Sequence, residues 1–238
     1  MYKVLILGTA SKTIDTALCR LGLEPVHADN SAQLEKVDLL QVNAVFLCGG
    51  PEAGNDEKNE FVKNAIALAK ENGAAVLFDP QLRSFENTEE NLRLVKSLAA
   101  VSDVFLPNLR EAQLLCGLDG EDDPEKLAAA ILDWGTKKTV ITLGKQGAYF
   151  KSRVECGTAP TFRADNVVDY SGAGDGFAAG LISGICEEIP LSEAVVRANA
   201  VGSMQIQNAG EDEGLPTMEQ LREYMLSHRF VVDGCKDI

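Results

Sequence analysis

Short apolar runs alternate with longer amphipathic stretches over the first two thirds of this 238-residue chain. The apolar runs lie at residues 3–8, 44–48, 74–79, 104–106 and 139–143. Each is nearly continuous in apolar residues, as are strands that are buried on both faces of a parallel sheet. The helices that we expect between them lie at residues 13–22, 58–72, 89–100 and 124–135. Repeated β-then-α units predict right-handed crossovers and a doubly wound α/β fold.

The pattern changes after residue 143. We expect two further strands and three further helices there. They lie at residues 148–151 and 161–169 for the strands, and at 173–187, 192–208 and 217–228 for the helices. Because the sequence contains no internal repeat and no low-complexity linker, it predicts one α/β domain over residues 1–238.

Acidic residues outnumber basic ones: 36 Asp and Glu stand against 22 Lys and Arg, for a formal net charge of −14. Nucleic acids and anionic membranes both attract clustered cations, so this charge argues against either partner. The six cysteines are scattered without a CxxC pair, and no apolar run approaches the roughly 20 residues that span a bilayer. We therefore expect reduced thiols and a cytoplasmic protein that acts on a small molecule.

Residues 169–177 read DYSGAGDGF and lead into an apolar helical stretch. Gly172, Ala173 and Gly174 carry little side-chain bulk where the helix begins, so backbone N–H groups and the helix dipole can bind an anion there. Asp175 follows in the first helical turn, where a carboxylate can accept a proton from a hydroxyl that attacks a phosphoryl group. The alternative is a glycine-rich helix start that Asp175 merely stabilises. The residues alone leave both interpretations open.

This segment resembles the C-terminal signature Asp-Thr-Thr/Ser-Gly-Ala-Gly-Asp of the ribokinase-like (PfkB) carbohydrate kinase family. Four further segments resemble motifs of that family in the same order. They are FDPQLR at residues 78–83, LPNLREA at 106–112, VITLGKQGA at 140–148, and ANA with GEDEGLPT at 198–200 and 210–217. The resemblance implies a ribokinase-like three-layer α/β/α sandwich with a mostly parallel sheet. ATP would bind across the carboxyl ends of the strands, with the nucleotide-binding part at about residues 104–228.

The resemblance also implies a role for each matching residue. Asp175 would be the catalytic base, and Gly172, Ala173 and Gly174 would hold the transferred phosphoryl group. Contacts to the nucleotide are implied for Asn108, Thr142, Gly144, Gly147 and Asn199.

Metal ions are implied at two places. Asn108 and Glu111 lie three residues apart at a helix start and would stand around Mg²⁺ and the phosphates. The same two residues also fit a helix cap with Glu at its third position. Asp169 resembles the acid that helps to hold a monovalent cation such as K⁺ in several members of the family.

The acceptor site is the least defined part of the sequence. Tyr170 and Gln81 stand where the family has Thr and Asn, and we recognise no lid before residue 78. Gly49 and Gly50 follow an expected strand as a β-α loop that can line the acceptor pocket. Arg83 stands next to a strand end, where it can contact substrate or phosphate or form a surface salt bridge.

Three functions compete on this evidence. The first is an ATP-dependent kinase that phosphorylates a hydroxyl of a small metabolite, with a sugar or sugar acid as the leading class. Without a lid, a neighbouring subunit would have to exclude water, so we expect a dimer or higher homo-oligomer. The second is a non-catalytic, nucleotide-binding regulatory protein derived from such a kinase. The third is an NAD-dependent Rossmann enzyme, which ranks low because residues 8–12 (GTASK) lack the glycine fingerprint.

Overall fold

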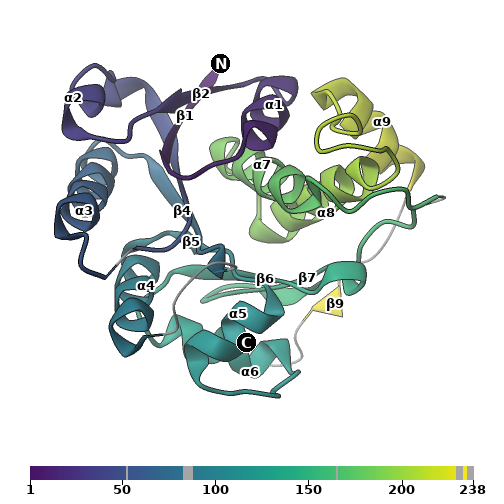
Figure 1. The fold of residues 1–238 in the computed structure, drawn as a ribbon. Helices are drawn as coiled ribbons and strands as arrows, with labels where there is room; N and C mark the ends of the chain where they lie inside the picture. The colour runs from purple at the N-terminus through teal and green to yellow at the C-terminus, as the bar shows by residue number, and fades with distance from the viewer. Residues whose placement is uncertain (52, 83–87, 165, 229–232, 235–238) are drawn as a thin grey trace.

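The computed structural model describes residues 1–51, 53–82, 88–164, 166–228 and 233–234. Within these residues nine strands form one sheet in the order β2-β1-β3-β4-β5-β6-β7-β8-β9 (Figure 1). The strands are β1 (Tyr2–Gly8), β2 (Leu23–His27), β3 (Val42–Cys48), β4 (Ala75–Asp79), β5 (Val104–Phe105), β6 (Lys138–Thr142), β7 (Ala148–Ser152), β8 (Cys156–Ala159) and β9 (Asp233–Gly234). The pairs from β2 through β6 are parallel, and β7, β8 and β9 extend the sheet in antiparallel fashion.

Helices cover both faces of the sheet (Figure 1). They are α1 (Lys12–Arg20), α2 (Ser31–Leu34), α3 (Asp56–Glu71), α4 (Glu89–Val101), α5 (Leu109–Cys116), α6 (Pro124–Leu132), α7 (Ala173–Cys186), α8 (Leu191–Gln205) and α9 (Met218–Ser227), with short 3₁₀ turns η1 (Leu39–Gln41) and η3 (Gly144–Gln146). No helix in the described ranges is long and apolar enough to cross a membrane.

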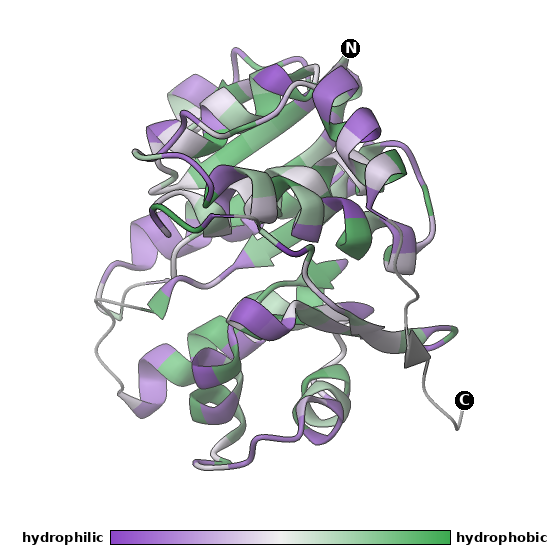
Figure 2. Cartoon of the chain, turned by 90° about the vertical axis from the view of Figure 1, so that its right-hand side faces the viewer, coloured by the Kyte–Doolittle hydropathy of each residue, from purple (hydrophilic) through white to green (hydrophobic). Residues whose placement is uncertain are grey.

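The alternation of side chains along the strands builds two hydrophobic cores. Val4 and Ile6 of β1 pack into a core with α1, α7, α8 and α9, whereas Leu5 and Leu7 pack into a core with α3, α4, α5 and α6. This follows from the period of two along a strand. Figure 2 shows predominantly hydrophobic strands between helices that carry both hydrophilic and hydrophobic residues. The predicted three-layer α/β/α sandwich is confirmed.

Most of the predicted elements are present, but one predicted strand is wrong. The chain forms β8 before Pro160, and the described residues from Pro160 to Ser171 have no regular secondary structure. Val167 and Val168, which we expected to belong to a strand at 161–169, are 44% and 50% exposed. Proline supplies no N–H to a ladder, so pairing with β7 ends at Ala159.

Two other expectations need correction. The sequence analysis missed β2, because Pro25 interrupts its apolar pattern; the strand lies at the edge of the sheet, where proline is tolerated. Cys19, Cys48, Cys116 and Cys186 are free thiols, as we expected, but Cys156 is disulfide-bonded. Spacing along a chain carries little information about such pairing.

Candidate active site

A cavity of about 720 Å³ opens at the carboxyl edge of the sheet. It is bordered by the loops after β1, β4, β5 and β6 and by the start of α7. Its lining residues are Ser11, Asp79, Gln81, Leu106, Asn108, Glu111, Thr142, Val168, Asp169, Tyr170, Ser171, Gly172, Gly174, Asp175, Phe177 and Glu211. The fold thus brings together most of the residues that the sequence singled out from 108 to 175. Open parallel sheets place their ligands at this edge.

The start of α7 presents backbone N–H groups to this cavity. Gly172 is the N-cap of the helix and has a left-handed conformation with φ of 75°. A Cβ at this position would overlap the carbonyl oxygen of Glu211, so only glycine fits without a rearrangement. A Cβ at Gly174, by contrast, would meet no atom within 4 Å, which leaves room over the first turn of the helix. The Ala173 N–H donates to the Tyr170 carbonyl oxygen at 3.3 Å, and the room above Gly174 lets an anion approach the first turn of the helix closely.

Asp175 points its carboxylate toward the loop that follows β1. The hydroxyl of Ser11 donates to Asp175 Oδ2 at 2.6 Å, although the two residues are 164 positions apart in the chain. Ser11 is also the N-cap of α1, where its Oγ accepts from the Ile14 N–H at 3.4 Å. The GTASK loop therefore belongs to the site. From the sequence this loop is an ordinary β-α turn, or at most a contact to the acceptor, because no local motif relates Ser11 to Asp175.

A second carboxylate, that of Asp79, lies where β4 ends. Burial, followed by the negative charges of Glu111 and Asp175, raises the pKa of Asp79 to about 7, against the opposing effect of hydrogen bonds from Gln81. Burial also raises the pKa of the neighbouring Cys48 thiol, with smaller contributions from Asp79 and Asp175. Asp79 was not among the predicted site residues, although its place in FDPQLR at a strand end was a signal.

Glu111 and Asn108 form the helix cap that the sequence allowed. Asn108 Oδ1 accepts from the Glu111 N–H at 3.0 Å, and Glu111 Oε2 accepts from the Asn108 N–H at 2.9 Å. Glu111 Oε1 accepts from the Leu82 N–H at 2.8 Å. Because both carboxylate oxygens already accept an N–H, Glu111 is suited to contact a metal ion through water.

The donor set suits a magnesium ion that is held largely by its nucleotide. No group of three or more His, Cys, Asp or Glu side chains in the described part of the chain is arranged to hold a metal by itself. Mg²⁺ often keeps several waters and takes one or two protein carboxylates together with phosphate oxygens. The raised pKa of Asp79 indicates that its negative charge is poorly compensated, and a cation beside Asp79 and Glu111 would relieve this.

Several predicted residues lie outside the cavity lining. Asn199 is buried in α8 and donates to the carbonyl oxygens of Ala159 at 2.8 Å and Pro160 at 3.4 Å. Gly147, with φ of 90°, closes the turn before β7, where a Cβ would overlap the backbone of residues 159–161. Gly144 belongs to η3. The nucleotide contacts of these three residues stay predictions.

The residues predicted for the acceptor pocket are only partly placed. Gly49 donates its N–H to the Asp79 carbonyl oxygen at 2.9 Å, which ties the loop after β3 to the end of β4. Gly49 and Gly50 do not line the cavity of Asp175. Ala173, between two lining glycines, is not a lining residue either. Arg83 lies outside the described residues.

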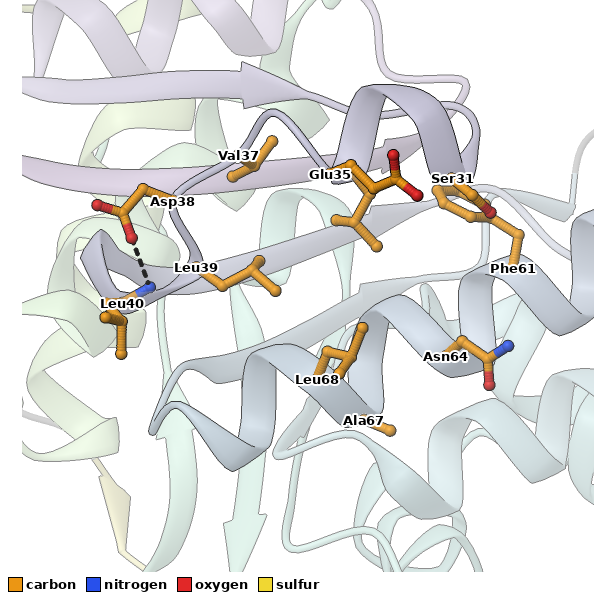
Figure 3. Close-up of a pocket in the computed structure, with 11 residues that line it drawn as sticks. Ser31, Glu35, Val37, Asp38, Leu39, Leu40, Phe61, Asn64, Ala67 and Leu68 are labelled. Carbon is orange, nitrogen blue, oxygen red and sulfur yellow. Dashed lines mark hydrogen bonds between the residues drawn. The ribbon is translucent and has the colours of Figure 1, made fainter.

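A second cavity lies away from this edge and differs in chemistry. It has a volume of about 640 Å³ and lies between the α2–η1 segment and α3 (Figure 3). Its walls are mainly apolar, and the carboxylate of Asp38 is turned to the backbone N–H of Leu40, at 3.2 Å (Figure 3). Its acids, Glu35 and Asp38, lie near a helix of four residues, whereas Asp175 lies in the first turn of a helix of 14 residues, so we identify the cavity at the sheet edge as the candidate active site.

Comparison with known proteins identifies the family. The family model described as pfkB family carbohydrate kinase matches residues 20–218. The chain belongs to the pfkB family of carbohydrate kinases. The chain is also 37% identical, over 189 residues, to a 2-dehydro-3-deoxygluconokinase of Bacillus subtilis. That alignment covers 79% of this chain but 57% of the relative, so the chain spans little more than half of the length of this pfkB kinase.

Solved structures of low sequence identity share the fold. An E. coli protein described as ribokinase II, in complex with ATP and Mg²⁺, superposes with a TM-score of 0.78 at 19% identity, over 96% of this chain and 100% of that one. A fructokinase double mutant of Vibrio cholerae, with fructose, ADP and potassium ion bound, gives a TM-score of 0.76 at 19% identity, over 94% and 98% of the two chains. These similarities support the ribokinase-like architecture that the motifs implied.

Proposed function

We propose that this chain is an ATP-dependent phosphotransferase that transfers the γ-phosphoryl group to a hydroxyl of a sugar or sugar acid. The observation that carries the proposal is the arrangement at the start of α7. The carboxylate of Asp175, held by the Ser11 hydroxyl, faces the same cavity as the N-terminal turn of α7. A proton acceptor beside an anion site is what phosphoryl transfer to an alcohol requires.

Each group at the site would have a separate role in phosphoryl transfer. Asp175 would accept the proton of the acceptor hydroxyl as its oxygen attacks the phosphorus. The N–H groups around Gly172, Ala173 and Gly174 would bind the phosphoryl oxygens as the bond to the leaving ADP breaks. Mg²⁺, held with the nucleotide near Asp79 and Glu111, would neutralise phosphate charge. Most of the rate enhancement would then come from positioning and electrostatic stabilisation.

The class of acceptor is inferred from the relatives. The Bacillus relative is named for a sugar acid, and the Vibrio structure holds a sugar. Tyr170, which lines the cavity and is 75% exposed, offers an aromatic face beside the place where an acceptor would lie. A sugar or sugar acid is therefore the first class to test.

The test is ADP release from Mg·ATP across a panel of sugars, sugar acids, nucleosides and vitamin precursors. We expect acceptor-dependent turnover that is lost in Asp175→Asn. Asp119→Asn, at an exposed turn after α5, is the matched control and should keep wild-type activity. Wild-type turnover that Asp175→Asn retains would refute the role of Asp175.

A second candidate is a nucleotide-binding regulatory protein. It predicts ATP binding without turnover for every acceptor in the panel. ADP release with any acceptor would exclude it.

A further inference from the structure

One side-chain amide joins two loops that border the candidate active site. Gln205, the last residue of α8, is fully buried. Its Nε2 donates to the carbonyl oxygen of Ser171 at 3.1 Å and to that of Gly210 at 2.7 Å. Ser171 immediately precedes Gly172, the N-cap of α7, and Gly210 belongs to the loop between α8 and α9. The amide therefore fixes the residue that leads into the N–H groups of α7.

Asp169 joins the same two residues through their N–H groups. Asp169 Oδ1 accepts from the Ser171 N–H at 2.9 Å, and Oδ2 accepts from the Gly210 N–H at 3.2 Å. These hydrogen bonds lower the pKa of Asp169. Both carboxylate oxygens of Asp169 and both backbone carbonyls thus already accept an N–H hydrogen bond.

The orientation of the Gln205 amide follows from its acceptors. A flipped amide would point Oε1 at two carbonyl oxygens, so Nε2 has to face them. Oε1 then has no hydrogen-bond partner among the described residues. A buried acceptor without a partner costs free energy. The two hydrogen bonds that Gln205 Nε2 donates to the two loops offset the cost of the unpartnered Oε1.

Carbonyl and carboxylate oxygens that converge from two loops are also a donor set for a monovalent cation. The family resemblance implied such a cation near Asp169. Here Gln205 Nε2 already lies 3.1 Å and 2.7 Å from the two carbonyl oxygens, in the position that a cation bound to both would need, so the residues as arranged do not fit a bound cation. We propose that Gln205 is a positioning residue that takes the place of a monovalent cation and holds the start of α7 ready for phosphoryl transfer. The catalytic part of this inference rests on the proposed function, whereas the link between the loops does not.

Three variants separate an amide link from a cation site. Gln205→Ala removes the amide and opens space between the oxygens. Gln205→Met also removes the amide but fills the space with a side chain of similar volume. Gln207→Ala is the matched control, because the amide of Gln207 donates locally, to the carbonyl oxygen of Ser203 at 3.0 Å.

The melting temperature, the Kd for Mg·ADP and kcat are measured in KCl, NaCl and tetramethylammonium chloride at equal ionic strength. Wild-type protein should give the same values in all three salts. In tetramethylammonium, Gln205→Ala should melt at a lower temperature and bind Mg·ADP about tenfold more weakly, as the loss of two neutral hydrogen bonds implies. KCl should restore both properties to Gln205→Ala but not to Gln205→Met. Gln207→Ala should behave as wild type.

Two results would overturn the inference. One is a wild-type melting temperature or Mg·ADP affinity that rises with K⁺, and the other is a Gln205→Ala protein that equals wild type in tetramethylammonium. The melting temperature is read without nucleotide or turnover, so it decides the link between the loops whether or not the chain is a kinase. Failure of the proposed function would appear elsewhere, as the absence of ADP release from wild-type protein across the acceptor panel.

Discussion

Ser11→Gly isolates the contact that holds the proposed base. The substitution removes the hydroxyl that donates to Asp175 Oδ2 at 2.6 Å. It largely preserves the start of α1, because replacing serine by glycine at an N-cap costs only about a few tenths of a kcal/mol. Ser11→Thr keeps a hydroxyl and should restore the wild-type behaviour.

Two effects of the lost hydrogen bond oppose each other. A hydrogen bond to a charged acceptor contributes about 1.5–3 kcal/mol, and it is weaker when the acceptor is a protonated carboxyl group. The Ser11 hydroxyl therefore stabilises the ionised form of Asp175, and loss of this hydrogen bond makes Asp175 a stronger base. The loss also frees the carboxylate to rotate, and a displacement of about 1 Å at a reacting group can cost about 100-fold in rate. We expect positioning to dominate and kcat to fall about tenfold, which corresponds to about 1.4 kcal/mol.

The assay is steady-state ADP release with the best acceptor, at saturating Mg·ATP. We expect the KM for ATP to stay at the wild-type value, because Ser11 would contact neither the nucleotide nor Mg²⁺. Thr88→Ala removes the side-chain cap of α4, which accepts from the Asn91 N–H at 3.2 Å, and controls for the loss of a helix cap. A Ser11→Gly kcat within roughly twofold of wild type, against the loss expected from misplacement, would refute the positioning role.

Three further predictions concern stability and assembly. Gly172→Ala places an alanine in a left-handed conformation and against the Glu211 carbonyl oxygen. The free energy of unfolding, measured in urea, should therefore fall by at least about 1–2 kcal/mol. Gly174→Ala is the control and should leave this free energy unchanged, because the added methyl group meets open space. Burial raises the pKa of Asp79 well above its ordinary value, to about 7 in the folded state, so its ionisation destabilises the folded state as the pH rises through this range. Asp79→Asn should therefore unfold at higher urea than wild type at pH 8, with no such gain at pH 3.5; an equal gain at both pH values would contradict the burial argument. Light scattering should give the mass of a dimer or higher homo-oligomer, since the described strands all belong to one sheet and supply no separate lid; a monomer with full activity would contradict this.

The architecture could be predicted because it depends on local periodicity. β1, β3, β4 and β6 read as apolar runs, since they are buried on both faces by two helical layers. The capping box of Asn108 and Glu111 could also be predicted, because all of its groups lie within four consecutive residues. The strand predicted at residues 161–169 is wrong, because the apolar pattern there is not matched by strand pairing after Pro160. Val167 and Val168 are instead exposed at the surface.

The site could be predicted only in part, because its contacts join distant segments. Asp175 and the glycines of α7 were found through their motif, but the Ser11 hydroxyl that contacts Asp175 comes from the other end of the chain. Gln205 belongs to no quoted motif, and its role depends on two carbonyl groups that the fold brings to it. The cytoplasmic location, the oligomeric state and the nucleotide contacts of Asn199 stay predictions.

Direct transfer of the γ-phosphoryl group tests the central claim most closely. Wild-type protein and Asp175→Asn would be incubated with Mg²⁺, γ-³²P-labelled ATP and the best acceptor, with the affinity for Mg·ATP measured in parallel. The account predicts a labelled phosphate monoester of the acceptor, formed about 100-fold or more slowly by Asp175→Asn at similar nucleotide affinity. Label that appears only as inorganic phosphate, or equal rates of transfer by the two proteins, would contradict it.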